Sequence, residues 1–518
     1  MTFIPTNSGE YHLIAQIYLT GLTLYYADSN LSMSDGHYYD GRMSASALSR
    51  AFSSFTEPTQ RQSTITITLR DEDLTIRQLL DTYVWGNRRV KLYIGKGRNL
   101  SDYKLEFNGL IKYPDGIDFD LEKVNIQLRD SRNSDWVILP ANKFWKTDYP
   151  HLEDAAEGQP IPIAYGAFSY LPMPVRCIDT TLNEFKIADH AIVDILQVYL
   201  NGDPVNNTNE NLTLATFRIS AYDPASDVVT VSFLGKLTGY TSFTDPISVL
   251  YDLLDYENVL SENIDFETLD ELAIEFKDFR CRRYINEEIS SNTLIEDLAI
   301  ECGFDVFIID GRYTARSRCP QLITDFDIDE MSILTDSFKV ETDPESLYAN
   351  KINCYYSYSP QIRDYLLMGQ ENNIYEQGRL GQIIPRTINF KWLYQKSDVY
   401  IVAQRLLMLY SREINVIQIT ALGDAILLDL ADHVGITFGH YFRRPMMIRE
   451  VTKNFDVMSC TIYGYDMIKH MLPGYWTDDD APSYEDATPE QRAIMGYWTN
   501  DIGEAKPGDP DSVKSCWW

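Results

Sequence analysis

The stretch of sequence from Thr293 to Pro360 decides the fold. It opens with Thr-Leu-Ile-Glu-Asp-Leu-Ala-Ile-Glu-Cys-Gly at 293–303. Thr293 and Glu296 have the spacing of a capping box, and Gly303 can end a helix in the left-handed conformation. One helical face would then carry Leu294, Leu298 and Cys302. The segment therefore predicts a helix of about three turns.

A hairpin and a new strand should follow this helix. Residues 304–316 read Phe-Asp-Val-Phe-Ile-Ile-Asp-Gly-Arg-Tyr-Thr-Ala-Arg, and Asp310-Gly311 favours the two positive φ angles of a type I′ turn. After a linker, Ile352-Asn353-Cys354-Tyr355-Tyr356-Ser357-Tyr358 is rich in residues that favour strands. The order is helix, hairpin, linker and strand, with no catalytic pattern.

On both sides of this segment the sequence predicts mostly strands. Thr64–Leu69 alternates polar and apolar residues, and similar runs occur at 90–94, 105–109 and 124–128. Helical spacing appears at Leu74–Trp85, at Pro246–Leu254 and after Ser397, a candidate N-cap. Asn201-Gly202 predicts a hairpin turn.

We expect a mainly β, multidomain protein with an α+β middle. Two similar antiparallel β-barrels would be separated by an inserted β module and an α+β domain. The predicted limits are 1–150 for the first barrel, 151–250 for the inserted module, 251–344 for the α+β domain, 345–466 for the second barrel and 467–518 for an extended aromatic and acidic C-terminal arm.

Composition excludes several classes of protein. The chain has 518 residues, 76 acidic and 45 basic, and its net charge of −31 disfavours a nucleic-acid binder. Seven scattered cysteines without a Cys-x-x-Cys pair predict core thiols rather than disulfides or zinc ligands. With no leader-like start and no long apolar run, we expect synthesis in the cytoplasm and no stable membrane insertion.

The sequence contains no pattern that predicts a catalytic residue, a metal or a cofactor. The seven histidines lack ligand spacing, and Gly95-Lys96-Gly97-Arg98 fits a hairpin loop better than a phosphate loop. Asp325–Asp336 begins like a calcium loop but lacks its central glycine and final glutamate. Carboxylate pairs for glycoside hydrolysis depend on distances in space, so a hydrolase stays open at this stage.

The C-terminal arm carries candidate partner-docking residues. Tyr-Trp pairs recur in an acidic, Pro- and Gly-containing segment, which suits a docking arm that anchors in pockets of a partner. Folding back on its own domain is an equal alternative. The candidates are Tyr475, Trp476, Tyr497, Trp498, Trp517 and Trp518.

The layout resembles the tail hub or baseplate hub proteins of tailed bacteriophages. The resemblance rests on Phe107-Asn108-Gly109-Leu110-Ile111 with Leu128-Arg129-Asp130, on the helix and hairpin at 293–316, on Pro344-Glu345 with Asn350, on 432–437 with 447–451, and on the Tyr-Trp-Thr arm. It covers most of the chain, although the module at about 160–250 is larger than such proteins require.

The resemblance implies a structural protein of the virion tail tip rather than an enzyme. Hubs of this kind are homotrimers that adapt a sixfold tail tube to a threefold tip and form part of the DNA exit channel. The implied partners are a distal tail or tail tube protein, a tape measure protein and a central fibre or tip protein, with DNA present only in passage. A receptor-binding adhesin and a cell-wall hydrolase are the alternatives.

Overall fold

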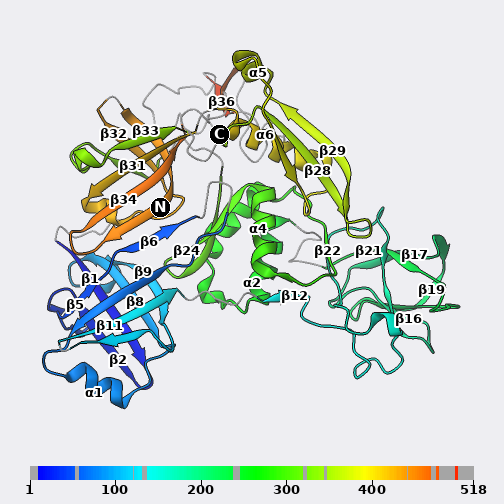
Figure 1. Cartoon of the computed structure of the whole chain (residues 1–518), viewed down its shortest axis with the longest axis horizontal. Helices are drawn as coiled ribbons and strands as arrows, with labels where there is room; N and C mark the ends of the chain where they lie inside the picture. The colour runs from blue at the N-terminus through cyan, green and yellow to red at the C-terminus, as the bar shows by residue number, and fades with distance from the viewer. Residues whose placement is uncertain are drawn as a thin grey trace.

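The computed structural model describes residues 10–52, 58–120, 122–130, 137–236, 245–318, 324–342, 347–412, 414–439, 441–467, 474–477 and 496–499. Two β-domains lie one above the other at the left of Figure 1, helices fill the centre, and a smaller β module lies at the right. The chain is mainly β with an α+β middle, as predicted.

The first β-domain is built on one eight-stranded sheet in the order β2-β1-β8-β9-β11-β7-β5, with β10 beside β11. All four runs predicted as strands are strands, and α1 (Thr75–Thr82) lies within the predicted helix. The other elements are β1 (Tyr11–Leu19), β2 (Leu22–Ala27), β3 (Leu31–Ser32), β4 (Tyr38–Tyr39), β5 (Met43–Ala45), β7 (Thr64–Arg70), β8 (Arg89–Lys96), η1 (Leu100–Asp102), β9 (Tyr103–Ile111), β10 (Ile117–Phe119) and β11 (Lys123–Asp130).

The second β-domain has the order β26-β32-β33-β34-β31-β27. Its elements are β26 (Phe326–Ile328), η4 (Thr335–Ser337), β27 (Lys339–Thr342), β31 (Asn415–Leu422), η5 (Gly423–Leu427), β32 (His433–Phe438), β33 (Tyr441–Asn454) and β34 (Ser459–Asp466). Strands β26 and β27 thus precede the predicted limit at 345, while residues 351–410 form other elements inserted between β27 and β31.

The two β-domains share one topology. In the first, β7, α1, β8, β9 and β11 follow in sequence and pair as β8-β9-β11-β7; in the second, β31, η5, β32, β33 and β34 pair as β32-β33-β34-β31. An earlier strand flanks each end: β5 and β27 pair with β7 and β31, and β1 and β26 pair with β8 and β32. One difference is that β26 is parallel to β32. Closure of either sheet into a barrel stays a prediction.

The middle contains the predicted helix and hairpin. Helix α4 (Ser291–Cys302) buries Leu294, Leu298 and Cys302 and ends at Gly303, whose φ is 82°. Strands β24 (Phe304–Ile309) and β25 (Arg312–Ser317) pair around Asp310 and Gly311, whose φ angles of 53° and 72° fit the type I′ turn.

The predicted capping box is wrong. The N-cap of α4 is Ser290, whose hydroxyl accepts the Thr293 N–H at 3.2 Å, so the helix starts earlier than predicted. The Glu296 carboxylate instead accepts bonds from Thr59 at 2.8 Å and Asn292 at 2.7 Å. Glu296 therefore accepts a hydrogen bond from distant Thr59 instead of capping its own helix.

Two further helices pack with α4. Helix α2 (Pro246–Tyr256) confirms the predicted helix, and Asp245 caps it. Helix α3 (Phe266–Phe276) was not predicted, although its buried Leu269, Leu272 and Phe276 have helical spacing. These helices pack against β24 and β25 in one core.

An arm inserted in the second β-domain shares this middle core. It consists of β28 (Lys351–Ser359), β29 (Asp364–Asn372), α5 (Ile374–Leu380), β30 (Pro385–Asn389) and α6 (Lys396–Tyr410). Helix α6 confirms the helix predicted after Ser397 and buries an apolar stripe, but its N-cap is Gln395, and Ser397 donates to Asp398 instead. Buried Asn350 fixes the loop before β30, because its amide donates to the Gln382 carbonyl and accepts the Ile384 N–H.

The inserted module has two four-stranded sheets and its own core, with Phe185, Phe217 and Phe233 fully buried. Asn201 and Gly202 form the predicted turn, with φ angles of 53° and 92°. Its strands are β14 (Met173–Pro174), β15 (Arg176–Asp179), β16 (Glu184–Lys186), β17 (Asp194–Leu200), β18 (Asp203–Val205), β19 (Asn207–Asn211), β20 (Thr216–Ile219) and β21 (Val229–Leu234).

Short strand pairs join the module to the middle. Strand β12 pairs with β23, and β13 pairs with β22, where the chain passes between the middle and the inserted module. The bounds are β12 (Ile138–Leu139), η2 (Asp154–Ala156), β13 (Ile163–Tyr165), η3 (Ser261–Asn263), β22 (Arg283–Ile285) and β23 (Ile289–Ser290).

No helix in the described ranges is both long enough and apolar enough to span a membrane.

One carboxylate of α4 holds the arm. Glu301 is 2% exposed and accepts the N–H groups of Lys391 and Trp392 at 2.7 Å and of Leu393 at 3.2 Å. Burial, with a smaller contribution from Asp297, raises the pKa of Glu301 to about 8. The folded protein therefore binds this proton more tightly than the unfolded chain does.

Because the folded pKa lies above the unfolded one, this group costs the fold nothing below the unfolded value and destabilises it as pH rises toward 8. We predict that Glu301→Gln reduces the loss of unfolding free energy between about pH 4.5 and pH 8, the interval between the unfolded and the folded pKa of Glu301, as measured by urea unfolding. Substitution of exposed Glu122 by Gln is the control. Parallel pH profiles for wild type and Glu301→Gln would contradict the assignment.

Candidate functional site

A strand crosses between the two β-domains. Strand β6 (Leu48–Ala51) begins three residues after β5 ends, yet it pairs with β33 of the second β-domain from Ala51↔Glu450 to Leu48↔Lys453. The apolar faces of both sheets form one continuous core that also includes η5 and Phe307. Separation of the two β-domains would therefore break a strand pair and expose a shared core.

Buried charges lie at this crossing. The Arg50 guanidinium on β6 donates to Glu106 on β9 at 2.8 Å and to Asp429 at 2.5 Å. Lys453 on β33 donates to the same Glu106 carboxylate at 2.6 Å. All four side chains are at most 5% exposed. Two ions of each sign, from two β-domains, thus share one buried site.

The hairpin turn between β24 and β25 extends this site. Lys104 on β9 lies 3.6 Å from Asp429 and donates to the Leu427 carbonyl at 2.8 Å. Burial alone would raise the pKa of Asp429, but Arg50, Lys453 and Lys104 outweigh burial and lower it. Asp310 lies close enough for Lys104 to oppose the rise that burial gives its pKa. Three acidic groups then face three basic groups.

A second ionic cluster ties the same hairpin to the second β-domain. Asp305 on β24 accepts Arg318 at 2.7 Å and also binds Arg449 on β33. The Arg449 guanidinium lies 3.9 Å from the centre of the Phe52 ring, just beyond β6. Arg316 on β25 donates to Asp432 at 2.9 Å. We call these two clusters together the ionic junction.

The ionic junction has a structural role. It joins both β-domains and the middle hairpin through buried ion pairs. Removal of one partner from a buried ion pair leaves an uncompensated charge, which is strongly unfavourable. The junction therefore holds three parts of the chain in one relative arrangement. No sequence pattern predicted the junction, although Lys104 and Glu106, two charged residues at alternate positions of β9, were a signal.

We predict that Asp305→Asn, which leaves Arg318 and Arg449 without their carboxylate, lowers the free energy of unfolding by about 3–5 kcal/mol. Exposed Asp456→Asn is the control. Chemical denaturation followed by tryptophan fluorescence measures the difference. A loss equal to that of the control would contradict the role given to the junction.

The predicted docking residues lie only partly within the described residues. Strands β35 (Gly474–Thr477) and β36 (Gly496–Thr499) pair in parallel, and in the backbone register Tyr475 is the partner of Tyr497 and Trp476 the partner of Trp498. The repeated sequence thus forms a paired backbone structure. Trp517 and Trp518 lie outside the described residues, and a docking role for the six aromatic residues stays a prediction.

Other predicted features have clear positions. Cys177, Cys281, Cys302, Cys354 and Cys460 are free and buried, as expected for core thiols, whereas Cys319 and Cys516 lie outside the described residues. Gly95 and Lys96 end β8, and Gly97 and Arg98 begin the connection to β9. Among described residues, no cluster of three or more His, Cys, Asp or Glu could hold a metal.

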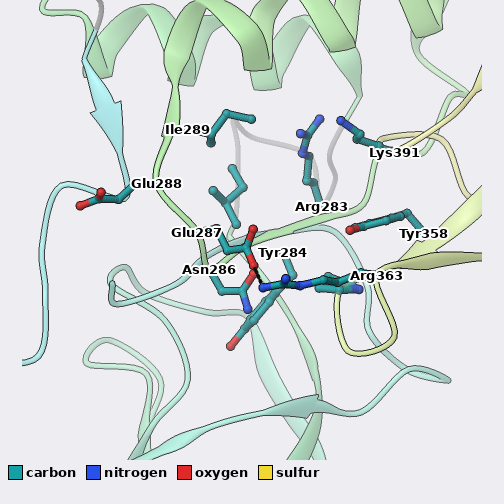
Figure 2. A pocket seen from close by; sticks show the side chains of 11 residues that line it. Arg283, Tyr284, Asn286, Glu287, Glu288, Ile289, Tyr358, Arg363 and Lys391 are labelled. Atoms are coloured by element: carbon teal, nitrogen blue, oxygen red, sulfur yellow. Dashed lines mark hydrogen bonds and ion pairs between the residues drawn. The ribbon is translucent and has the colours of Figure 1, made fainter. Parts of the chain in front are cut away.

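A cavity of 210 Å³ lies where β22 meets the arm. Figure 2 shows Arg363 reaching Glu287, while Arg283 and Lys391 point away from that pair. Arg283 and Lys391 both approach Asp297, at 2.8 and 3.4 Å, and Glu288 binds Lys143 at 2.6 Å. Each of the five charged residues that line the cavity therefore has an ion-pair partner, and Arg283 and Lys391 share Asp297.

A larger cleft of 720 Å³ separates the two β-domains on another side of their contact. Tyr11 and Lys96 of the first β-domain bind Asp424 of η5 across it, at 2.7 and 3.1 Å. This second polar bridge uses none of the charged residues of the ionic junction. The two β-domains are thus fastened at more than one point.

These features define a multidomain β protein in which two β-domains of matching topology are fixed together. No protein-family model matches the sequence, and no curated protein matches it. Among solved structures, similar folds occur in phage tail, prophage tail, baseplate and gene transfer agent virion proteins.

Three of these solved structures span most of both chains. A tail protein from Neisseria meningitidis MC58 has 8% identity and a TM-score of 0.41, with 89% of this chain and 97% of that one covered. Prophage tail protein gp18 from Listeria monocytogenes EGD-e has 12% identity and a TM-score of 0.40, covering 88% and 94%. The 43 kDa tail protein of prophage MuSo2 from Shewanella oneidensis has 8% identity and a TM-score of 0.36, covering 90% and 99%.

Proposed function

We propose that this chain is a structural hub of a phage tail tip. In this proposal it forms a homotrimer that adapts a sixfold tail tube to a threefold tip and forms part of the DNA exit channel. Its partners would be a distal tail or tail tube protein, a tape measure protein and a central fibre or tip protein.

The observation that carries the proposal is the matching topology of the two β-domains. A threefold assembly of a chain with one such domain presents three equivalent surfaces, whereas a chain with two similar domains presents six. Three copies of this chain would therefore offer six similar β-domains to a sixfold tube. The match covers six strands in each domain, in the same spatial order.

The ionic junction supports the same role. Six domains contributed by three chains can form a regular ring only if the two domains of each chain keep one relative orientation. The pairing of β6 with β33 and the buried ion pairs of Arg50 and Asp305 hold the two β-domains in one relative orientation. A flexible linker between the two β-domains would not keep them in one relative orientation.

The acidic composition suits a channel for DNA. With a net charge of −31, acidic groups along the channel would repel the phosphate backbone and oppose its adhesion during passage. A particle structure with a neutral or basic channel lining would contradict this part of the proposal. The aromatic C-terminal arm is proposed to dock on a neighbouring tail protein.

We predict that the purified chain forms trimers. Light scattering coupled to size-exclusion chromatography should give three times the chain mass of 59.7 kDa at micromolar concentration. A mass that stays at one or two chains as concentration rises would contradict the proposed hub. Asp305→Asn provides an internal comparison, because loosened β-domains should reduce the trimer fraction.

A further inference from the structure

The arm carries a strand edge without the usual protection against association. Strand β29 lies at the end of the sheet β29-β28-β30, and it forms the outer margin of the arm in Figure 1. In an antiparallel pair, alternate residues turn their N–H and C=O groups away from the partner strand. One edge of β29 therefore offers backbone donors and acceptors over nine residues.

The side chains of β29 make this edge unusual. Leu366 and Leu367 are each 48% exposed and Met368 is 65% exposed, and Tyr355 lies beside Met368 on β28. Because neighbouring residues of a strand point to opposite faces, apolar groups are exposed on both faces of β29. Soluble proteins shield such edges with lysine, proline, bulges or short strands. The sequence Asp-Tyr-Leu-Leu-Met-Gly-Gln-Glu-Asn contains no lysine or proline, and its two charged residues, Asp364 and Glu371, lie at or near its ends.

The apolar surface continues beyond the strand. Ile374 and Tyr375 at the start of α5 are 78% and 77% exposed, although they follow β29 directly. Exposed apolar side chains gathered on one strand and on the helix that follows it are typical of a site of protein interaction.

We propose that β29 receives a β-strand from another tail protein. The added strand would extend the sheet through backbone hydrogen bonds, place apolar side chains at alternate positions over Leu366 and Met368, and carry basic residues near both ends. This inference rests on the proposed hub function.

The acidic residues of β29 indicate which side chains should flank the added strand. Asp364 begins β29 and Glu371 lies near its end, about 23 Å away in an extended chain. The preceding Arg363 is already bound by Glu287, and the chain as a whole carries −31. A strand with lysine or arginine at matching positions would gain attraction, whereas an acidic strand would be repelled.

The position of the arm favours a different protein, rather than a second copy of this chain, as the source of the added strand. In Figure 1 the arm lies on the far side of the central helices from the two stacked β-domains. If those domains form the ring of the proposed trimer, β29 faces away from the ring and its neighbouring copies.

A synthetic peptide tests the inference. The probe is a fluorescein-labelled decapeptide in which alternating valine and threonine are flanked by two lysines at each end, titrated into the full chain and followed by anisotropy. We expect saturable binding together with hydrogen-exchange protection of residues 364–372. The double variant Leu366→Lys/Met368→Lys, at exposed positions, should weaken binding about tenfold or more.

Two controls make the experiment specific. Leu182→Lys/Val228→Lys, at exposed positions of the inserted module, should leave the affinity unchanged. A peptide with glutamate in place of lysine should bind at least about tenfold more weakly. No saturable binding, or equal binding by the β29 variant, would overturn the inference.

Other occupants of β29 give separate results. Concentration-dependent assembly beyond the trimer that disappears in the β29 variant would mean that a second copy binds there. Peptide binding that requires removal of residues 467–518 would mean that the C-terminal arm of the same chain covers the edge. Either result overturns the inference. A trimer that does not bind the peptide leaves the hub function standing, whereas a monomer that binds it contradicts only the hub function.

Discussion

The ionic junction is the constraint on which the rest of the structure depends. Arg50, Glu106, Asp429 and Lys453 come from both β-domains, and Asp305 brings in the middle hairpin. Buried ions are tolerated only when their partners are in place, so an altered domain orientation would leave several charges unpaired at once. Apolar contact alone would allow gradual sliding. The charges make one arrangement strongly preferred, and β6 adds a backbone pairing that reinforces it.

This fixed arrangement gives meaning to the repeated topology. Two β-domains with the same strand order can occupy equivalent positions in a regular ring only when their relative position is constant. The insertion of β28 to β30 with α6 between β27 and β31 then carries the arm away from the paired domains, while Glu301 anchors it to the middle. The chain thus combines a repeated framework with parts that serve individual contacts.

Local signals in the sequence predicted the local structure well. Asp310-Gly311, Asn201-Gly202 and Gly303 adopt the expected conformations because their backbone preferences act over a few residues. The cap of α4 was wrong because Ser290 competed successfully with Thr293, and Glu296 found a partner in Thr59, 237 residues away. The ionic junction was out of reach for the same reason. Arg50 and Asp429 are separated by 379 positions, and no pattern in one sequence pairs charges over that distance.

The central claim is that three copies of this chain place six β-domains of one topology in a ring, with each pair fixed by its ionic junction. Electron cryomicroscopy of the purified particle tests it most directly. The account predicts a threefold ring in which first and second β-domains alternate around an open or plugged channel, with Arg50 and Asp429 in contact within every chain. A particle in which the two β-domains of a chain separate, or in which only one of them reaches the ring, would contradict it.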